Sequence, residues 1–76
     1  MMAQNKAIIY TINNCGYCTA AKNLLHKKGI EFIETNLTGR DDDIVELIKK
    51  TNHRTFPQIF ITGQFIGGFN ELKNLS

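Results

Sequence analysis

The chain lacks three features that would assign it to a specialised class of protein. No apolar run approaches the length needed to cross a bilayer, so a membrane partner is not expected. The formal net charge is only +2 and the nine Lys and Arg residues are scattered, so we expect no nucleic-acid partner. The first ten residues contain no long apolar segment followed by a small-residue cleavage site. We therefore expect a cytoplasmic protein that works in a reducing environment.

What is present is typical of one small globular domain spanning residues 1–76. Hydrophobic residues make up 42% of the chain and charged residues 21%, which is ordinary for a folded domain. The only two cysteines are Cys15 and Cys18. In a reducing compartment such a pair is more often catalytic or metal-binding than a permanent crosslink. A disulfide across so short a loop would also restrict the unfolded chain very little.

Apolar periodicity predicts seven elements in the order β-α-β-α-β-β-α. The first helix separates two β-prone runs, which favours parallel strands joined by a right-handed crossover. Pro57 precedes an apolar run and is expected at the start of a strand, because proline cannot donate a ladder hydrogen bond. The strands are expected at 6–10, 30–35, 58–61 and 65–66, and the helices at 15–28, 41–50 and 69–75. The predicted fold class is therefore α/β, a four-stranded mixed sheet flanked by helices.

The cysteine pair lies where the first strand gives way to the first helix. A thiol at a helix start is expected to have a lowered pKa, because unpaired backbone N–H groups and the helix dipole favour the thiolate. Cys15 is therefore the expected nucleophile in disulfide exchange, and Cys18, one turn further on and more shielded, the resolving thiol. A zinc site is the competing interpretation. It would need two more ligands, and only His26 and His53 are available, far apart in the sequence.

Three motifs in register resemble those of the glutaredoxin family: YTINNCGYC at 10–18, RTFPQIFI at 54–61 and IGGFNEL at 66–72. The family carries C-P-Y-C or a near variant, then T-V-P, then G-G-x-D-[DE]-L. The resemblance covers nearly the whole chain. It implies a thioredoxin-like fold, a redox disulfide between Cys15 and Cys18, and a glutathione-dependent thiol–disulfide oxidoreductase acting on protein–glutathione mixed disulfides and protein disulfides.

The resemblance also implies where glutathione binds. Pro57 is expected to be cis, with the backbone of Phe56 pairing with the cysteinyl part of glutathione. Arg54 is expected to pair with the glycyl carboxylate, and Gly67 and Gly68 to let bare backbone approach the ligand. The start of the last helix is expected to receive the γ-glutamyl carboxylate. The implied site comprises Tyr17, Arg54, Thr55, Phe56, Pro57, Gly68, Phe69, Asn70 and Glu71.

Several positions depart from the family pattern. Ile12 replaces a lysine that supports the thiolate and the ligand in many members, and Lys22 is a candidate to compensate. Asn70 replaces an aspartate, so the ion pair with the ligand's ammonium is expected to pass to Glu71. Phe56 replaces valine and adds bulk near Cys15.

Gly16 stands where the family's C-P-Y-C motif has proline, and this difference is the basis for a second candidate function. Some family members without that proline hold a [2Fe–2S] cluster between two subunits, with the first cysteine (here Cys15) of each subunit and two glutathiones as ligands. A third possibility is a redoxin reduced by thioredoxin reductase that feeds ribonucleotide reductase. The expected partners are glutathione, disulfide-containing or glutathionylated proteins and, indirectly, glutathione reductase. We expect a monomer, or a dimer in the cluster-bridged alternative.

Overall fold

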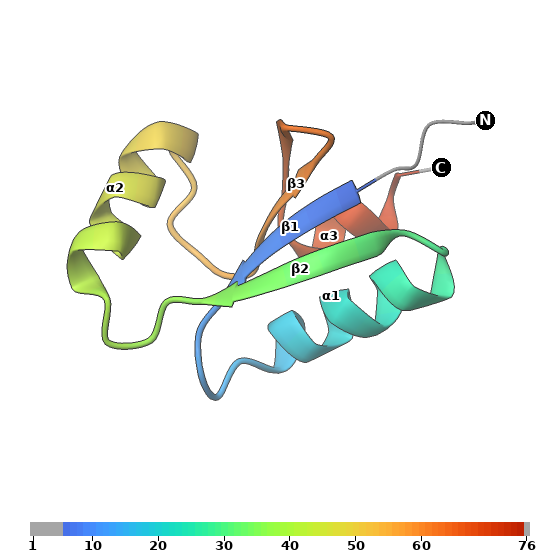
Figure 1. The fold of residues 1–76 in the computed structure, drawn as a ribbon, viewed down its shortest axis with the longest axis horizontal. Helices are drawn as coiled ribbons and strands as arrows, with labels where there is room; N and C mark the ends of the chain where they lie inside the picture. Colours follow the sequence, from blue (N-terminus) through green and yellow to red (C-terminus); the bar gives the residue numbers. More distant parts are fainter. Residues whose placement is uncertain (1–5, 76) are drawn as a thin grey trace.

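The predicted order of elements is confirmed by the computed structural model, which describes residues 6–75 (Figure 1). The elements are β1 (Lys6–Thr11), α1 (Gly16–Lys27), β2 (Glu31–Asn36), α2 (Asp41–Thr51), β3 (Gln58–Ile61), β4 (Gln64–Gly67) and α3 (Phe69–Lys73). Most predicted ends are within one residue of these bounds. The last helix is shorter than predicted, since it ends at Lys73 rather than Leu75.

The sheet is mixed, with the strand order β2-β1-β3-β4. Strands β1 and β2 are parallel and are joined by α1, whereas β3 is antiparallel to both β1 and β4. Between β3 and β4, Thr62 and Gly63 have φ values of 51° and 80°. When both residues of a two-residue loop have positive φ, the twist of the turn matches the twist of the two strands in a β-hairpin. In the antiparallel pair of central strands, Tyr10 near the end of β1 lies opposite Gln58 at the start of β3.

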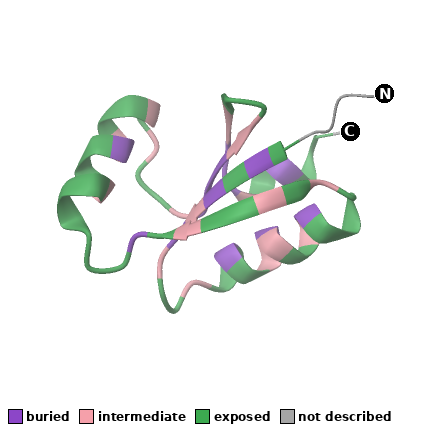
Figure 2. Cartoon of the chain, viewed as in Figure 1, coloured by how far each residue is buried: buried purple, intermediate pink, exposed green. Residues whose placement is uncertain are grey.

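The hydrophobic core lies between the sheet and the helices α1 and α3. Side chains alternate between the two faces of a strand, so Ala7 and Ile9 of β1 point to the same side and are almost fully buried. They pack with Leu25 of α1 and Leu72 of α3, neither of which is exposed. Figure 2 shows the buried positions of α1 as one stripe facing the sheet. This packing brings the start of α1 and the start of α3 to one side of the sheet.

The other face of the sheet is more open. Ile8 of β1 and Ile33 of β2 pair in register, and their side chains are 40% and 61% exposed. Helix α2 lies apart from α1 and α3, beyond the end of β2 (Figure 1). Its acidic first turn and basic last turn follow the helix dipole, as the sequence predicted. No helix within residues 6–75 is long and apolar enough to span a membrane.

Candidate redox and ligand site

The two cysteines lie at the start of α1 and form a disulfide, with their Cα atoms 5.3 Å apart. Cys15 is the N-cap of the helix, and its Sγ accepts a hydrogen bond from the backbone N–H of Cys18 at 3.1 Å. Such a donor stabilises a sulfur anion, because the first N–H groups of a helix have no partner within the helix. Cys15 is half-buried and Cys18 is only 3% exposed. The two sulfurs therefore differ in access as the sequence predicted.

The segment before β3 lies against the disulfide. The peptide bond between Phe56 and Pro57 is cis, as the resemblance implied. The carbonyl oxygen of Phe56 is 3.8 Å from Cys15 Sγ, although the two residues are 41 positions apart in the chain. Phe56 is half-buried and Pro57 is buried. The backbone of this segment therefore borders the sulfur that is expected to react.

A buried glutamine holds this segment in place, and the sequence-based interpretation did not identify it. Gln58 is fully buried. Its amide oxygen accepts a hydrogen bond from the Thr51 hydroxyl at 2.8 Å, and its amide nitrogen donates to the backbone carbonyl of His53. The network ties the end of α2 to the start of β3. The signal available in the sequence was one polar residue inside the apolar run 56–61.

The glycine pair at the end of β4 lies where a Cβ would crowd neighbouring atoms of the protein. Gly67 has φ of +123°, and a Cβ there would come within 2.6 Å of Glu71 Cγ. A Cβ at Gly68 would be 3.2 Å from the carbonyl oxygen of Pro57. Glu71 Oε1 accepts a hydrogen bond from the Gly68 N–H at 2.8 Å. That bond, helped by the backbone N–H of Glu71 and by nearby His53, lowers the pKa of the Glu71 carboxyl group.

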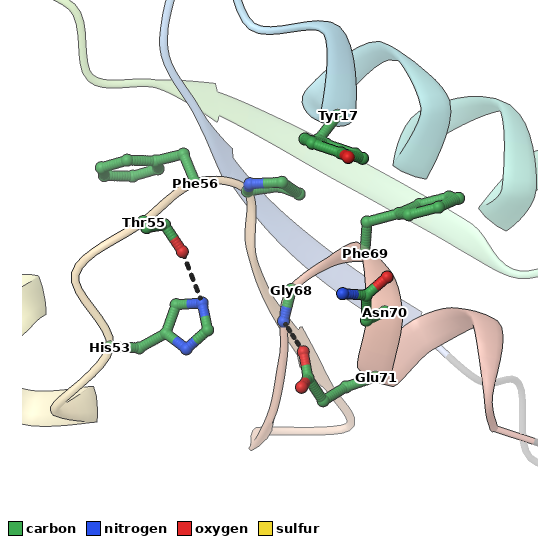
Figure 3. A pocket seen from close by; sticks show the side chains of 9 residues that line it. Tyr17, His53, Thr55, Phe56, Gly68, Phe69, Asn70 and Glu71 are labelled. Carbon is green, nitrogen blue, oxygen red and sulfur yellow. Dashed lines mark hydrogen bonds between the residues drawn. The ribbon is translucent and has the colours of Figure 1, made fainter.

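These segments enclose a pocket of about 320 Å³ (Figure 3), within the size range of small-molecule sites. Eight of the nine residues that the resemblance implied line it, and His53 is the ninth lining residue. Arg54 is exposed and is not among the lining residues. The lining consists of Tyr17, His53, Thr55, Phe56, Pro57, Gly68, Phe69, Asn70 and Glu71.

Two aromatic rings flank one side of this pocket. Tyr17, next to the cysteines on α1, is 65% exposed. Its ring centroid is 5.8 Å from that of Phe69 at the start of α3, and the two planes are tilted by 34°. Figure 3 shows the two rings facing each other across the space between the helices. Their contact joins the start of α1 to the start of α3 on this side of the pocket.

Lys22 is engaged elsewhere rather than at the pocket. Its Nζ is 3.0 Å from Glu34 Oε1 on β2, and the hydroxyl of buried Thr11 donates to Glu34 Oε2 at 2.7 Å. The Thr11 hydrogen bond and, next, the Lys22 ammonium lower the pKa of the Glu34 carboxyl group. Lys22 is therefore paired with a carboxylate of the sheet. Within residues 6–75, no three His, Cys, Asp or Glu side chains form a group that could hold a metal ion.

A mixed four-stranded sheet, a C-x-x-C disulfide at a helix start and a cis-proline beside it define a thiol–disulfide oxidoreductase of the thioredoxin-like fold. Comparisons with known proteins specify the class further. The glutaredoxin family model matches residues 7–66. Glutaredoxin 3 of Escherichia coli (strain K12) is 45% identical over 67 residues, which cover 88% of this chain and 81% of that protein.

Solved structures give the same result. The crystal structure of glutaredoxin 1 from Francisella tularensis complexed with cacodylate has a TM-score of 0.76 and 38% identity, covering 91% of this chain and 88% of that one. A buckwheat glutaredoxin–glutathione complex has a TM-score of 0.81 and 30% identity, covering 88% of this chain and 64% of that one. The chain belongs to the glutaredoxin family.

Proposed function

We propose that this glutaredoxin uses glutathione to reduce protein–glutathione mixed disulfides and protein disulfides. One observation carries the proposal: a pocket of about 320 Å³ opens beside the redox cysteine, between the cis-proline segment and the start of α3. The related buckwheat glutaredoxin was crystallised as a complex with glutathione. Glutathione is a short peptide with polar ends and a central thiol, and the lining residue Phe56 has its carbonyl oxygen 3.8 Å from Cys15 Sγ.

The backbone of Phe56 is the element that would align the ligand. An extended peptide can pair with exposed backbone N–H and C=O groups as if it added a strand. Because the Phe56 carbonyl is 3.8 Å from Cys15 Sγ, a cysteinyl residue paired with Phe56 would present its sulfur to Cys15. The ring of Tyr17 and the Glu71 carboxylate would then flank the two ends of the ligand.

The proposed reaction with a mixed disulfide has two exchange steps. The Cys15 thiolate attacks the glutathione sulfur, a Cys15–glutathione disulfide forms, and the protein thiolate leaves and takes a proton from solvent. The thiolate of a second glutathione then attacks the bound glutathione sulfur, releasing glutathione disulfide and restoring the Cys15 thiolate. The first leaving group departs most easily when its own thiol has a low pKa.

A protein disulfide requires both cysteines. The Cys15 thiolate forms a mixed disulfide with one substrate sulfur, and Cys18 attacks Cys15 Sγ to release the reduced substrate. The product is the Cys15–Cys18 disulfide of the structure, which two glutathione thiols reduce. Glutaredoxin potentials of about −200 to −230 mV lie close enough to that of the cytosolic glutathione pool for this reduction to proceed.

Single cysteine variants test the proposal. Cys15→Ser should abolish glutathione-dependent reduction of a glutathionylated peptide, because it removes the nucleophile. Cys18→Ser should retain much of this activity and lose the reduction of protein disulfides. The measurement is glutathione disulfide production coupled to glutathione reductase. Equal losses in the two variants would contradict the one-cysteine step, and no activity of the unaltered protein with glutathione would contradict the proposal itself.

The two alternative functions stay predictions. The cluster alternative rests on Gly16, where a Cβ would meet no atom within 4 Å, so the packing of the protein does not require glycine there. Anaerobic purification with glutathione should then give visible absorption that Cys15→Ser removes. The redoxin alternative predicts faster reduction by thioredoxin reductase than by glutathione in a coupled assay. A cytoplasmic location and a monomeric state likewise remain proposals.

A further inference from the structure

His53 is the pocket residue that the family resemblance did not include. Its Nε2 is 3.2 Å from the hydroxyl oxygen of Thr55, and its ring packs edge-on against Phe65 with centroids 5.5 Å apart. The same nitrogen is 3.4 Å from the position that a Cβ would take at Gly68. Figure 3 shows the His53 ring beside Thr55 on the wall opposite Tyr17. The imidazole is therefore held half-buried, with one nitrogen at the pocket wall.

The backbone that carries His53 is fixed as well. The buried Gln58 amide donates to the His53 carbonyl, and the His53 N–H donates to the Thr51 hydroxyl at 3.2 Å. The N–H of His53 is thus hydrogen-bonded to the end of α2, and its carbonyl to the start of β3. With its backbone fixed, the ring can leave the pocket wall only by losing its contacts with Thr55 and Phe65.

The protonation state of His53 also sets the net charge of the side chains that line the pocket. Among the nine lining residues there is no lysine or arginine, and the only carboxylate is Glu71. Glu71 faces His53 from α3, Phe65 contributes an uncharged ring from β4, and Arg54 beside His53 in the chain is exposed and outside the lining. Because histidine is the side chain that ordinarily changes charge between pH 5 and 8, the lining is anionic with neutral His53 and balanced with protonated His53.

We propose that His53 makes the binding of the glutathione moiety pH-dependent, with tighter binding when the imidazole is protonated. This inference rests on the proposed function. Glutathione has two carboxylates and one ammonium group, so it approaches as a net anion and is repelled by an anionic lining. Protonated Nε2 must also donate to the Thr55 oxygen, which leaves the Thr55 hydroxyl proton free for a ligand oxygen. Neutral Nε2 can instead accept that proton and keep it from the ligand.

The test uses S-methylglutathione, whose thioether neither titrates nor exchanges with cysteine, and the disulfide form of the protein, in which no thiol titrates. Nuclear magnetic resonance titrations at pH 5.5 and 7.5 measure the dissociation constant. We expect roughly three- to tenfold tighter binding at pH 5.5, the size of one partly solvated charge interaction.

Three variants make the result specific to this imidazole. His53→Gln should bind with one affinity at both pH values, and His53→Arg should bind tightly at both. His26→Gln is the matched control, since His26 is exposed on α1 and outside the pocket, and it should keep the full pH dependence. Equal affinity of the unaltered protein at both pH values, or a His53→Gln variant that stays pH-dependent, would overturn this inference alone. No binding at either pH would overturn the proposed function too.

Discussion

Replacing the buried Gln58 by glutamate tests the network that supports the pocket. The Gln58 amide nitrogen donates to the His53 carbonyl, and the amide oxygen accepts from the Thr51 hydroxyl. A carboxylate at this position has no proton to give to the carbonyl oxygen, and the site has no access to solvent. Gln58→Glu is therefore expected to bind a proton on folding, with the carboxyl pKa raised by burial. A rise of about two units corresponds to about 3 kcal/mol lost at pH 7.

The sign of the pH dependence follows from linkage. The folded variant binds more protons than the unfolded chain between the unfolded carboxyl pKa, about 4.3, and the raised folded value, so its stability falls as pH rises through this window. Below about pH 4 both states are protonated and the loss is smallest. Urea unfolding followed by circular dichroism at pH 4 and pH 7 measures the free energy of unfolding.

Gln64→Glu is the matched control for this experiment. Gln64 is exposed in β4, so the same change there should alter the free energy of unfolding by less than about 0.5 kcal/mol at either pH. The wild-type protein, measured in parallel, removes the pH dependence that all variants share. If Gln58→Glu followed Gln64→Glu at both pH values, the buried network would be refuted.

Two further substitutions test other parts of the site. Gly67→Ala should cost about 2–3 kcal/mol of unfolding free energy, because φ of +123° strains any side chain and the new Cβ would displace Glu71. Gly63→Ala, at φ of +80° in open space, should cost less in the same urea assay, and equal losses would contradict this reasoning. Glu34→Gln should cost about 0.5–1 kcal/mol at pH 7, because its side chain is about one-third exposed. Since the folded pKa of Glu34 is lowered, this loss should vanish as pH falls through that value, and a loss that persisted in acid would exclude the ionic contribution.

The order of elements was predictable because each has a local signal. The run 6–10 is β-prone, the cysteine pair follows a polar turn, and glycines end several elements. These neighbouring signals all indicate the same order of strands and helices. The end of the last helix was not predictable in this way. The Leu75 N–H bonds to the Leu72 carbonyl three residues back, which tightens the chain and ends the helix at Lys73. The sequence of side chains does not show where a hydrogen bond to the carbonyl three residues back replaces the α-helical bond to the carbonyl four residues back.

The site residues that belong to the cysteine and proline motifs were predictable from the sequence. Tyr17 and Phe56 line the pocket because the cysteine and proline motifs fix their backbone positions. Whether Arg54 or its neighbour His53 faces the pocket depends on the irregular segment between α2 and β3, whose path is set by hydrogen bonds to Gln58. Those bonds form between elements, so no local pattern encodes them. Glu71 differs, because its carboxylate accepts a hydrogen bond from the Gly68 N–H only three residues back, which is a local contact at the start of α3.

Under the proposed function, reactivity and ligand affinity reside on different segments of this protein. The environment of Cys15 Sγ is set by the start of α1, where the Cys18 N–H is its donor. The pocket wall is formed by residues 53–57 and by Gly68–Glu71, which Gln58 and the glycine pair hold in place. The contacts described between them are that of the Phe56 carbonyl with Cys15 Sγ and the ring contact of Tyr17 with Phe69, and neither involves His53. Changes at His53 should therefore alter KM for glutathionylated substrates more than the rate of the Cys15 exchange step. Sequence variation in the 53–56 segment can therefore retune substrate binding while the redox pair stays the same.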